Sequence, residues 1–177
     1  MKKLRALLLI LLLALPALAD MPALTTEDFT LRLTEGEDAA TYRPGDDAAA
    51  LLAGLKACTG APVVMTFEDA DCMLPGMTRE YVTADEMIIV ATRPLPGDAA
   101  ANTVESVMVL TPEVATHRGA RVGMTLADVE ALYGTDYALD FDTVVYTNGE
   151  FEPQILFFFD LDTWTVTGWM LFRNLVI

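Results

Sequence analysis

The sequence predicts an α+β fold made of two tandem units, each a helix followed by an antiparallel meander of strands. Of the 177 residues, 53% are apolar, a share typical of a folded domain and too high for a disordered chain. Two segments place apolar residues at helical spacing and end on a glycine, Gly60 and Gly134. Runs of β-branched and aromatic residues follow each segment. This repeated order predicts the duplication of one helix-and-meander unit.

The first nineteen residues predict a signal peptide that is removed from the mature protein. Three of the first five residues are basic, Ala6–Leu15 is apolar, and Ala17–Ala19 offers small residues for cleavage before Asp20. The apolar run is shorter than the stretch of about 20 residues that a membrane-spanning helix needs. We therefore expect residues 1–19 to direct export, leaving a mature chain that is secreted or periplasmic and has no membrane span.

Residues 20–44 form a polar lead-in with a candidate strand at Phe29–Leu33, and residues 45–111 form the first unit. The helix of this unit begins after Gly45–Asp47 and ends at Gly60. Apolar or small residues recur along it with the spacing of one buried face, at Ala48, Leu51, Leu52, Leu55 and Cys58.

Four strands are expected to complete the first unit, because runs rich in β-branched and aromatic residues follow its helix. Residues 93–98 contain two prolines and predict a loop or hairpin tip, because proline is excluded from central strands. The four expected strands are Val63–Phe67, Arg79–Thr83, Met87–Thr92 and Val104–Leu110.

Residues 112–122 form a connector, and residues 123–177 form the second unit. Thr125 and Asp128 have the spacing of a capping box at the start of its helix, which ends at Gly134. Asn148-Gly149 predicts a tight turn between the first two strands that follow. These strands are expected at Thr143–Thr147, Gln154–Phe159 and Trp164–Phe172.

The two cysteines, Cys58 and Cys72, predict a structural disulfide. An even number of cysteines in an oxidising compartment usually forms disulfides. A metal site would need further ligands, and His117 is the only histidine of the sequence. We therefore expect a Cys58–Cys72 bridge, and neither a metal nor another cofactor.

The charge of the chain restricts its partners. The sequence has 26 Asp and Glu against 11 Lys and Arg, a formal charge of −15. Such a surface repels the phosphate backbone and no basic stripe is visible, so nucleic acid is excluded as a partner. Attraction to a basic partner is favoured instead.

A motif in the second unit resembles a known family. Residues 118–134, RGARVGMTLADVEALYG, are similar to the signature of exported bacterial domains of the β-lactamase inhibitor protein and BamE-like kind. Ala120 stands where that signature usually has Ile or Val. The resemblance implies a duplication like that of the β-lactamase inhibitor protein and protein binding through an open sheet face.

The last strand suggests which residues could bind a partner, because apolar groups alternate on both of its faces. If one face meets the helices, the other carries Trp169 and Leu171, near Phe158 and Tyr146. These four residues are the expected partner-binding residues. The alternative is that the two units bury them against each other.

Catalytic groups are scarce, which favours a binding function over an enzyme. Ser106 is the only serine and lies in an expected strand, whereas His117 lies in the connector. Asp140 with Asp142, and Asp160 with Asp162, could hold calcium or serve hydrolysis, although neither has EF-hand spacing. We expect an exported, non-enzymatic module that binds or inhibits a protein of the cell envelope or extracellular space. The alternative is a small calcium-dependent or hydrolytic enzyme that uses these acidic loops.

Overall fold

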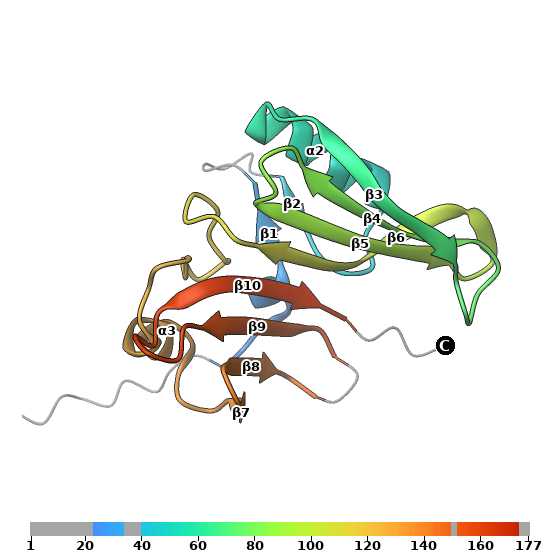
Figure 1. The fold of residues 1–177 in the computed structure, drawn as a ribbon. Coiled ribbons are helices and arrows are strands. Elements are labelled where there is room, and N and C mark those ends of the chain that lie inside the picture. The colour runs from blue at the N-terminus through green and yellow to red at the C-terminus, as the bar shows by residue number, and fades with distance from the viewer. Residues whose placement is uncertain (1–22, 34–39, 150–151, 174–177) are drawn as a thin grey trace, which may run out of the picture.

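The computed structural model describes residues 23–33, 40–149 and 152–173. The expected signal peptide, residues 1–19, lies outside them. An eight-stranded antiparallel sheet dominates the fold, in the order β3-β4-β5-β6-β10-β9-β8-β7 (Figure 1). The strands of this sheet are β3 Val63–Ala70, β4 Met77–Thr83, β5 Ile88–Leu95, β6 Asp98–Val109, β7 Ala138–Asp140, β8 Thr143–Thr147, β9 Gln154–Phe159 and β10 Val166–Phe172.

The remaining described elements are a 3-10 turn, a small sheet and two helices. A 3-10 turn, η1 (Thr26–Phe29), precedes a two-stranded sheet of β1 (Leu31–Arg32) and β2 (Thr41–Tyr42). The two helices are α2 (Ala48–Thr59) and α3 (Leu126–Tyr133). Among the described residues, neither helix has the length and apolar character that crossing a membrane requires.

The predicted fold class, α+β with two tandem helix-plus-antiparallel-meander units, is wrong. The protein is mostly β, and its long strands form one sheet because β6 pairs with β10. Four residue pairs make this junction, from Trp169 opposite Val109 to Phe172 opposite Ser106. In two separate meanders, β6 and β10 would each be an edge strand with unpaired backbone hydrogen-bonding groups. Pairing β6 with β10 satisfies these groups.

The local predictions for the helices are confirmed. The Asp47 carboxylate accepts a hydrogen bond from the Ala49 N–H at the start of α2, which ends at Gly60 with φ of 66°. Thr125 and Asp128 form the expected capping box of α3. This helix ends at Gly134, where φ is 86°.

Most expected strands are present with shifted ends, and one turn prediction needs correction. A hairpin tip does lie within residues 93–98, but it is limited to Pro96 and Gly97, because β5 continues to Leu95 and β6 begins at Asp98. Pro94 lies beyond the last pair with β4, so its missing N–H weakens no central ladder. Asn148-Gly149 does not close a two-residue turn, because β8 ends at Thr147 and β9 begins at Gln154.

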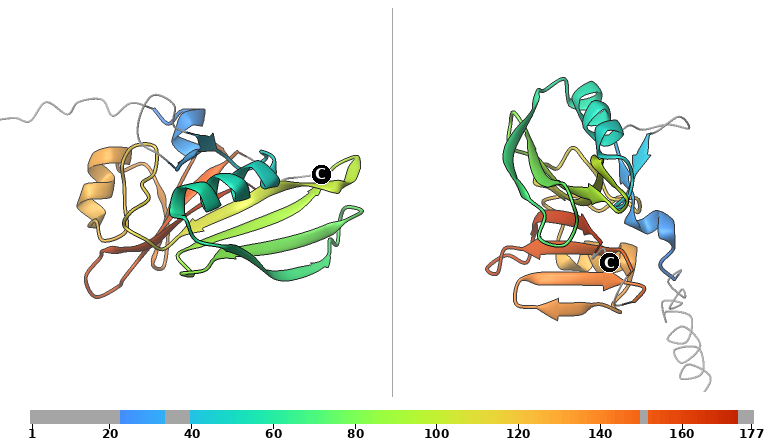
Figure 2. Two further views of the ribbon diagram at one scale, coloured as in Figure 1. Left: turned by 90° about the horizontal axis from the view of Figure 1, so that it is seen from above. Right: turned by 90° about the vertical axis from the view of Figure 1, so that its right-hand side faces the viewer.

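Both helices cover the same face of the sheet, and the core lies between them and the strands (Figure 2). Apolar residues of α2 such as Leu51 and Leu55 are completely buried there. The opposite face of the sheet, which faces the viewer in Figure 1, carries no helix. We call it the open face.

A buried ion pair fastens the N-terminal segment to the connector before α3. Arg118 donates from Nε and Nη2 to the two carboxylate oxygens of Asp28, over 2.6 and 2.7 Å. The same guanidinium donates to the carbonyls of Leu132 and Ala23, and lies 5.3 Å from the ring centre of Tyr133. Arg118 therefore joins three parts of the chain that are distant in sequence.

Candidate protein-binding surface

The structure places three of the four expected partner-binding residues in the core. Trp169, Leu171 and Tyr146 have no exposed surface, and the Tyr146 hydroxyl donates to the Gly134 carbonyl at 2.7 Å. Phe158 is half-buried on the open face. The expected surface built on Trp169 and Leu171 is therefore wrong, because these side chains point toward the helices.

The error concerns which alternate residues of β10 point inward. Trp169 lies opposite Val109 of β6 and Phe157 of β9, and all three are completely buried. The sequences of the neighbouring strands do indicate which face of the sheet is open. Ser106 and Gln154 are polar and alternate with the buried positions of β6 and β9, which identifies their own face as the open one.

A row of apolar residues crosses the open face from one edge of the sheet to the other. Met108 of β6 lies opposite Met170 of β10, and Met170 lies opposite Leu156 of β9. The same register continues outward in both directions. This apolar row consists of Val64, Val82, Ile89, Met108, Met170, Leu156, Val145 and Ala138, one residue from each strand of the sheet.

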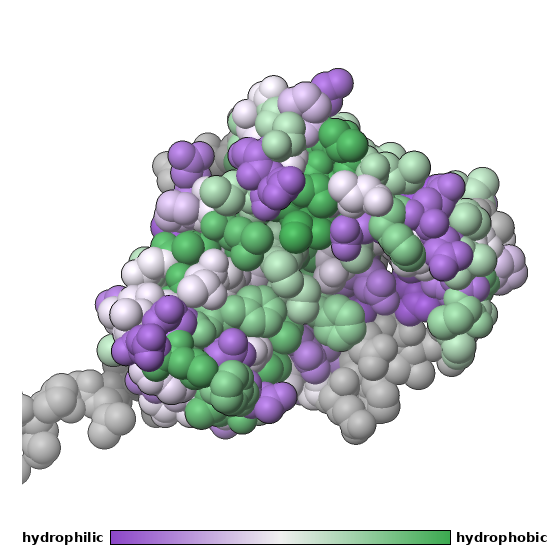
Figure 3. Space-filling view, viewed as in Figure 1, coloured by the Kyte–Doolittle hydropathy of each residue, from purple (hydrophilic) through white to green (hydrophobic). Residues whose placement is uncertain are grey.

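The residues of the apolar row remain accessible to solvent. The six central ones are half-buried, while Val64 and Ala138 at the ends are exposed. Figure 3 shows apolar side chains gathered across the middle of this face. A sheet face whose central row is apolar in every strand differs from the usual pattern of a solvated antiparallel sheet, in which that face is polar.

Gly168 widens the apolar area beside this row. A Cβ atom at this position would meet the Cδ2 atom of Leu110 at 2.7 Å, so glycine leaves room for Leu110 to lie over β10. Phe158 borders the same place, because its ring would lie 3.7 Å from such a Cβ atom. Leu110 and Phe158 are both half-buried and enlarge the apolar area.

Acidic residues share the open face with the apolar row. By register, Glu80 of β4 and Asp69 of β3 lie on this face near one edge, and Asp140 of β7 lies on it near the other. The Glu80 carboxylate accepts a hydrogen bond from the Thr66 hydroxyl at 3.0 Å. An apolar centre with acidic ends fits a protein surface that is apolar and basic.

The acidic loops considered for calcium binding are stabilised by hydrogen bonds within their own turns. Asp142 and Asp160 lie on neighbouring turns, since the Phe159 N–H donates to the Asp142 carbonyl at 2.8 Å. One Asp160 oxygen accepts bonds from the Asp162 and Thr163 N–H groups and the Thr163 hydroxyl, and these bonds lower the Asp160 pKa. No group of three or more His, Cys, Asp or Glu side chains suited to a metal ion occurs in the described parts of the chain.

The expected Cys58–Cys72 disulfide is wrong. Both cysteines are free and exposed, Cys58 at the end of α2 and Cys72 in the loop after β3. The eight residues of β3 lie between them and extend over about 23 Å. A disulfide requires Cα atoms within about 7 Å, so a strand of this length keeps the two thiols apart.

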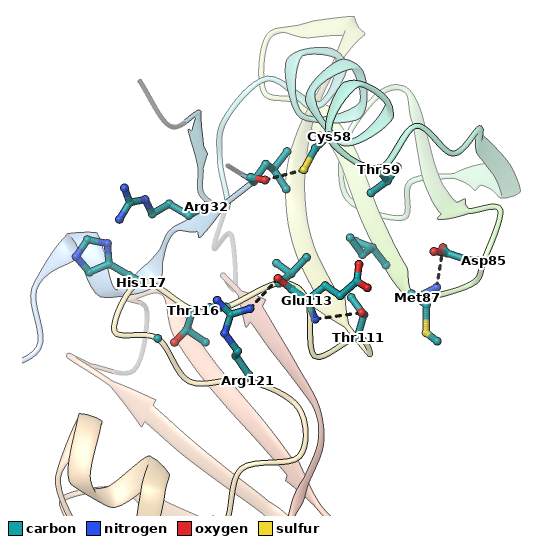
Figure 4. Close-up of a pocket in the computed structure, with 15 residues that line it drawn as sticks. Arg32, Cys58, Thr59, Asp85, Met87, Thr111, Glu113, Thr116, His117 and Arg121 are labelled. Carbon is teal, nitrogen blue, oxygen red and sulfur yellow. Dashed lines mark hydrogen bonds between the residues drawn. The ribbon is translucent and has the colours of Figure 1, made fainter. Parts of the chain in front are cut away.

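A pocket of about 580 Å³ lies at the C-terminal end of α2, between this end, the end of β1, the turn after β4 and the connector (Figure 4). The Cys58 thiol donates to the Leu33 carbonyl at 2.6 Å, and Arg121 donates to the Glu113 carbonyl at 2.8 Å. Asp85 accepts a bond from the Met87 N–H in the turn after β4. These hydrogen bonds stabilise the loops that surround the pocket.

The two residues considered for catalysis lie on separate elements. Ser106 pairs with Ala91 and Phe172 within the sheet. His117 lies in the connector, where its Nε2 atom is 3.7 Å from an oxygen of Glu27. The structure therefore gives these residues places in a strand and a loop, and describes no contact between them.

Comparisons of the chain with known protein families, with curated proteins and with solved structures found no match. The resemblance to β-lactamase inhibitor protein and BamE-like domains therefore stays an expectation based on the motif at residues 118–134.

Proposed function

We propose that this protein is an exported, non-enzymatic module that binds another protein through its open face. The observation that supports this most is the apolar row, which crosses all eight strands and stays accessible. Contiguous exposed apolar surface is uncommon on proteins that bind nothing. The partner belongs to the cell envelope or the extracellular space.

The chemistry of the surface defines the class of partner. Met108 and Met170 are adjacent at the centre of the sheet, and their flexible side chains can adapt to the shape of an apolar partner surface. The acidic residues on the same face and the charge of −15 favour a partner with basic groups around its apolar centre. Binding of this kind weakens as salt concentration rises.

The test compares two double variants in affinity capture from the envelope fraction of the source organism. Met170→Gln with Leu156→Gln makes the centre of the open face polar. Met73→Gln with Leu161→Gln makes the same chemical change at turn residues outside it, which are 67% and 44% exposed. Urea unfolding establishes that both variants are folded before capture.

We expect the wild type and the turn variant to retain the same protein, and the open-face variant to lose it. The retained protein should also be released by moderate salt. Equal capture by both variants, or capture of nothing beyond a bead control, would contradict the proposed function.

A further inference from the structure

The two edges of the eight-stranded sheet are unequal. Strand β7 at one edge has only three residues and ends on Asp140, and short acidic edges resist pairing with other strands. Strand β3 at the other edge has eight residues and is exposed along nearly its whole length. Its Val64, Met65 and Phe67 side chains are each about half exposed, at 52%, 48% and 51%.

The hydrogen-bonding groups at the two ends of β3 define its outward side. The Pro62 carbonyl accepts from the Ala84 N–H, so the alternation of antiparallel pairing turns the backbone groups of Val63 and Met65 away from β4. At the other end, the Asp71 N–H donates to the Gly76 carbonyl, which turns the groups of Glu68 and Ala70 outward.

A β-bulge in the middle of β3 connects these two outward sets. Met65 lies opposite Tyr81 and Phe67 lies opposite Glu80, which leaves Thr66 as the extra residue. The residues with outward backbone groups are therefore Val63 and Met65 before the bulge, and Glu68 and Ala70 after it. If two β3 strands lie antiparallel, Val63 of each can pair with Ala70 of the other, and Met65 of each can pair with Glu68 of the other.

We propose that β3 pairs in this register with β3 of a second copy of this chain. The two-fold axis passes between Thr66 and Phe67, and the two sheets become one continuous sheet. Each side chain meets one from the same face of the other sheet, because Met65 and Glu68 both lie on the helix side while Val64 and Asp69 both lie on the open face. The exposed Phe67 side chains come together beside the axis.

The charges of β3 suit this register. Glu68 lies opposite Met65, and Asp69 lies opposite Val64, so no acidic residue of β3 faces another one directly. The overall charge of each copy still opposes association. The dimer therefore strengthens as salt screens that repulsion, whereas binding of a basic partner by the open face weakens with salt.

Sedimentation equilibrium of the purified protein over a range of concentrations tests this inference, at low and high salt. We expect a monomer–dimer equilibrium whose dissociation constant falls as salt rises. Met65→Asp places a carboxylate opposite Glu68 twice in each dimer and should raise the dissociation constant at least tenfold. Leu139→Asp, at the β7 edge, adds the same charge at a similar exposure and should leave it unchanged.

The register has its own test. In a background with Cys58→Ser and Cys72→Ser, the double change Val64→Cys with Asp69→Cys should yield a covalent dimer on oxidation. Each single change should yield mostly monomer. A wild type that stays monomeric at every concentration and salt level would overturn the inference, as would a dimer insensitive to Met65→Asp or a failed crosslink in a protein that dimerises. The open-face double variant of Met170 and Leu156 should dimerise normally, so this inference and the proposed function can fail separately.

Discussion

Replacing Arg118 by alanine should destabilise the protein strongly, because its partner Asp28 is buried. The Asp28 side chain is 3% exposed and that of Arg118 is 13% exposed. Removing one partner of a buried ion pair costs about 3–5 kcal/mol, since the other charge is left uncompensated. Asp28 keeps the hydrogen bond from the Thr25 N–H at 2.7 Å, which places the expected loss near the lower limit, at about 3 kcal/mol.

Urea unfolding followed by tryptophan fluorescence measures this loss. Arg43→Ala is the matched control, because the Arg43–Asp46 ion pair is exposed and should contribute less than about 1 kcal/mol. Adding Asp28→Asn to Arg118→Ala removes the uncompensated charge and should recover part of the lost stability. A loss for Arg118→Ala no larger than that of the control would refute the reasoning.

The pH dependence gives a second check on the same residue. Burial disfavours the ionised form of Asp28, but the hydrogen bonds from Arg118 and Thr25 outweigh this and hold its pKa below the usual value. The pair therefore stabilises the wild type at neutral pH, and this contribution is lost as pH falls through the lowered pKa. Without Arg118, burial should raise the Asp28 pKa, so the deficit of Arg118→Ala should be largest at neutral pH and shrink in acid.

Three other substitutions or measurements follow from the structure. Trp169→Ala should reduce the free energy of unfolding by about 3–5 kcal/mol, because the side chain is fully buried; a loss below about 1 kcal/mol in urea unfolding would contradict its place in the core. Thr125→Ala should cost about 1 kcal/mol by removing the cap of α3, and Thr125→Ser should cost little in the same assay. Cys58 and Cys72 should both react with a thiol reagent in the folded protein without reductant, and a count of zero thiols would indicate a disulfide.

Local features of the fold could be predicted from the sequence, because they depend on neighbouring residues. Thr125, Asp128 and Gly134 define α3 through capping groups within nine positions. The expected strands Thr143–Thr147 and Gln154–Phe159 have the bounds that the structure shows. Each is recognisable from its content of β-branched or aromatic residues.

The arrangement of these elements could not be predicted from local patterns. The pairing of β6 with β10 joins segments about 60 positions apart, and no local turn motif in the sequence predicts it. The inward side of β10 is ambiguous in the sequence, because apolar residues occupy both of its faces and a register shift falls between Val166 and Gly168. Compartment and spacing predict the disulfide, but they do not show that the residues between the cysteines form one extended strand.

The junction between β6 and β10 also has a consequence for the order of folding. Every other pair of neighbours in the eight-stranded sheet consists of consecutive strands, so those pairs are hairpins with short loops. Bringing Trp169 to Val109 closes a loop of about 60 residues, which costs about 2 kcal/mol more entropy than closing a four-residue hairpin. The junction should therefore form late, after the hairpins on both sides. Mutations in it, such as Trp169→Ala, should mainly accelerate unfolding and change the folding rate little.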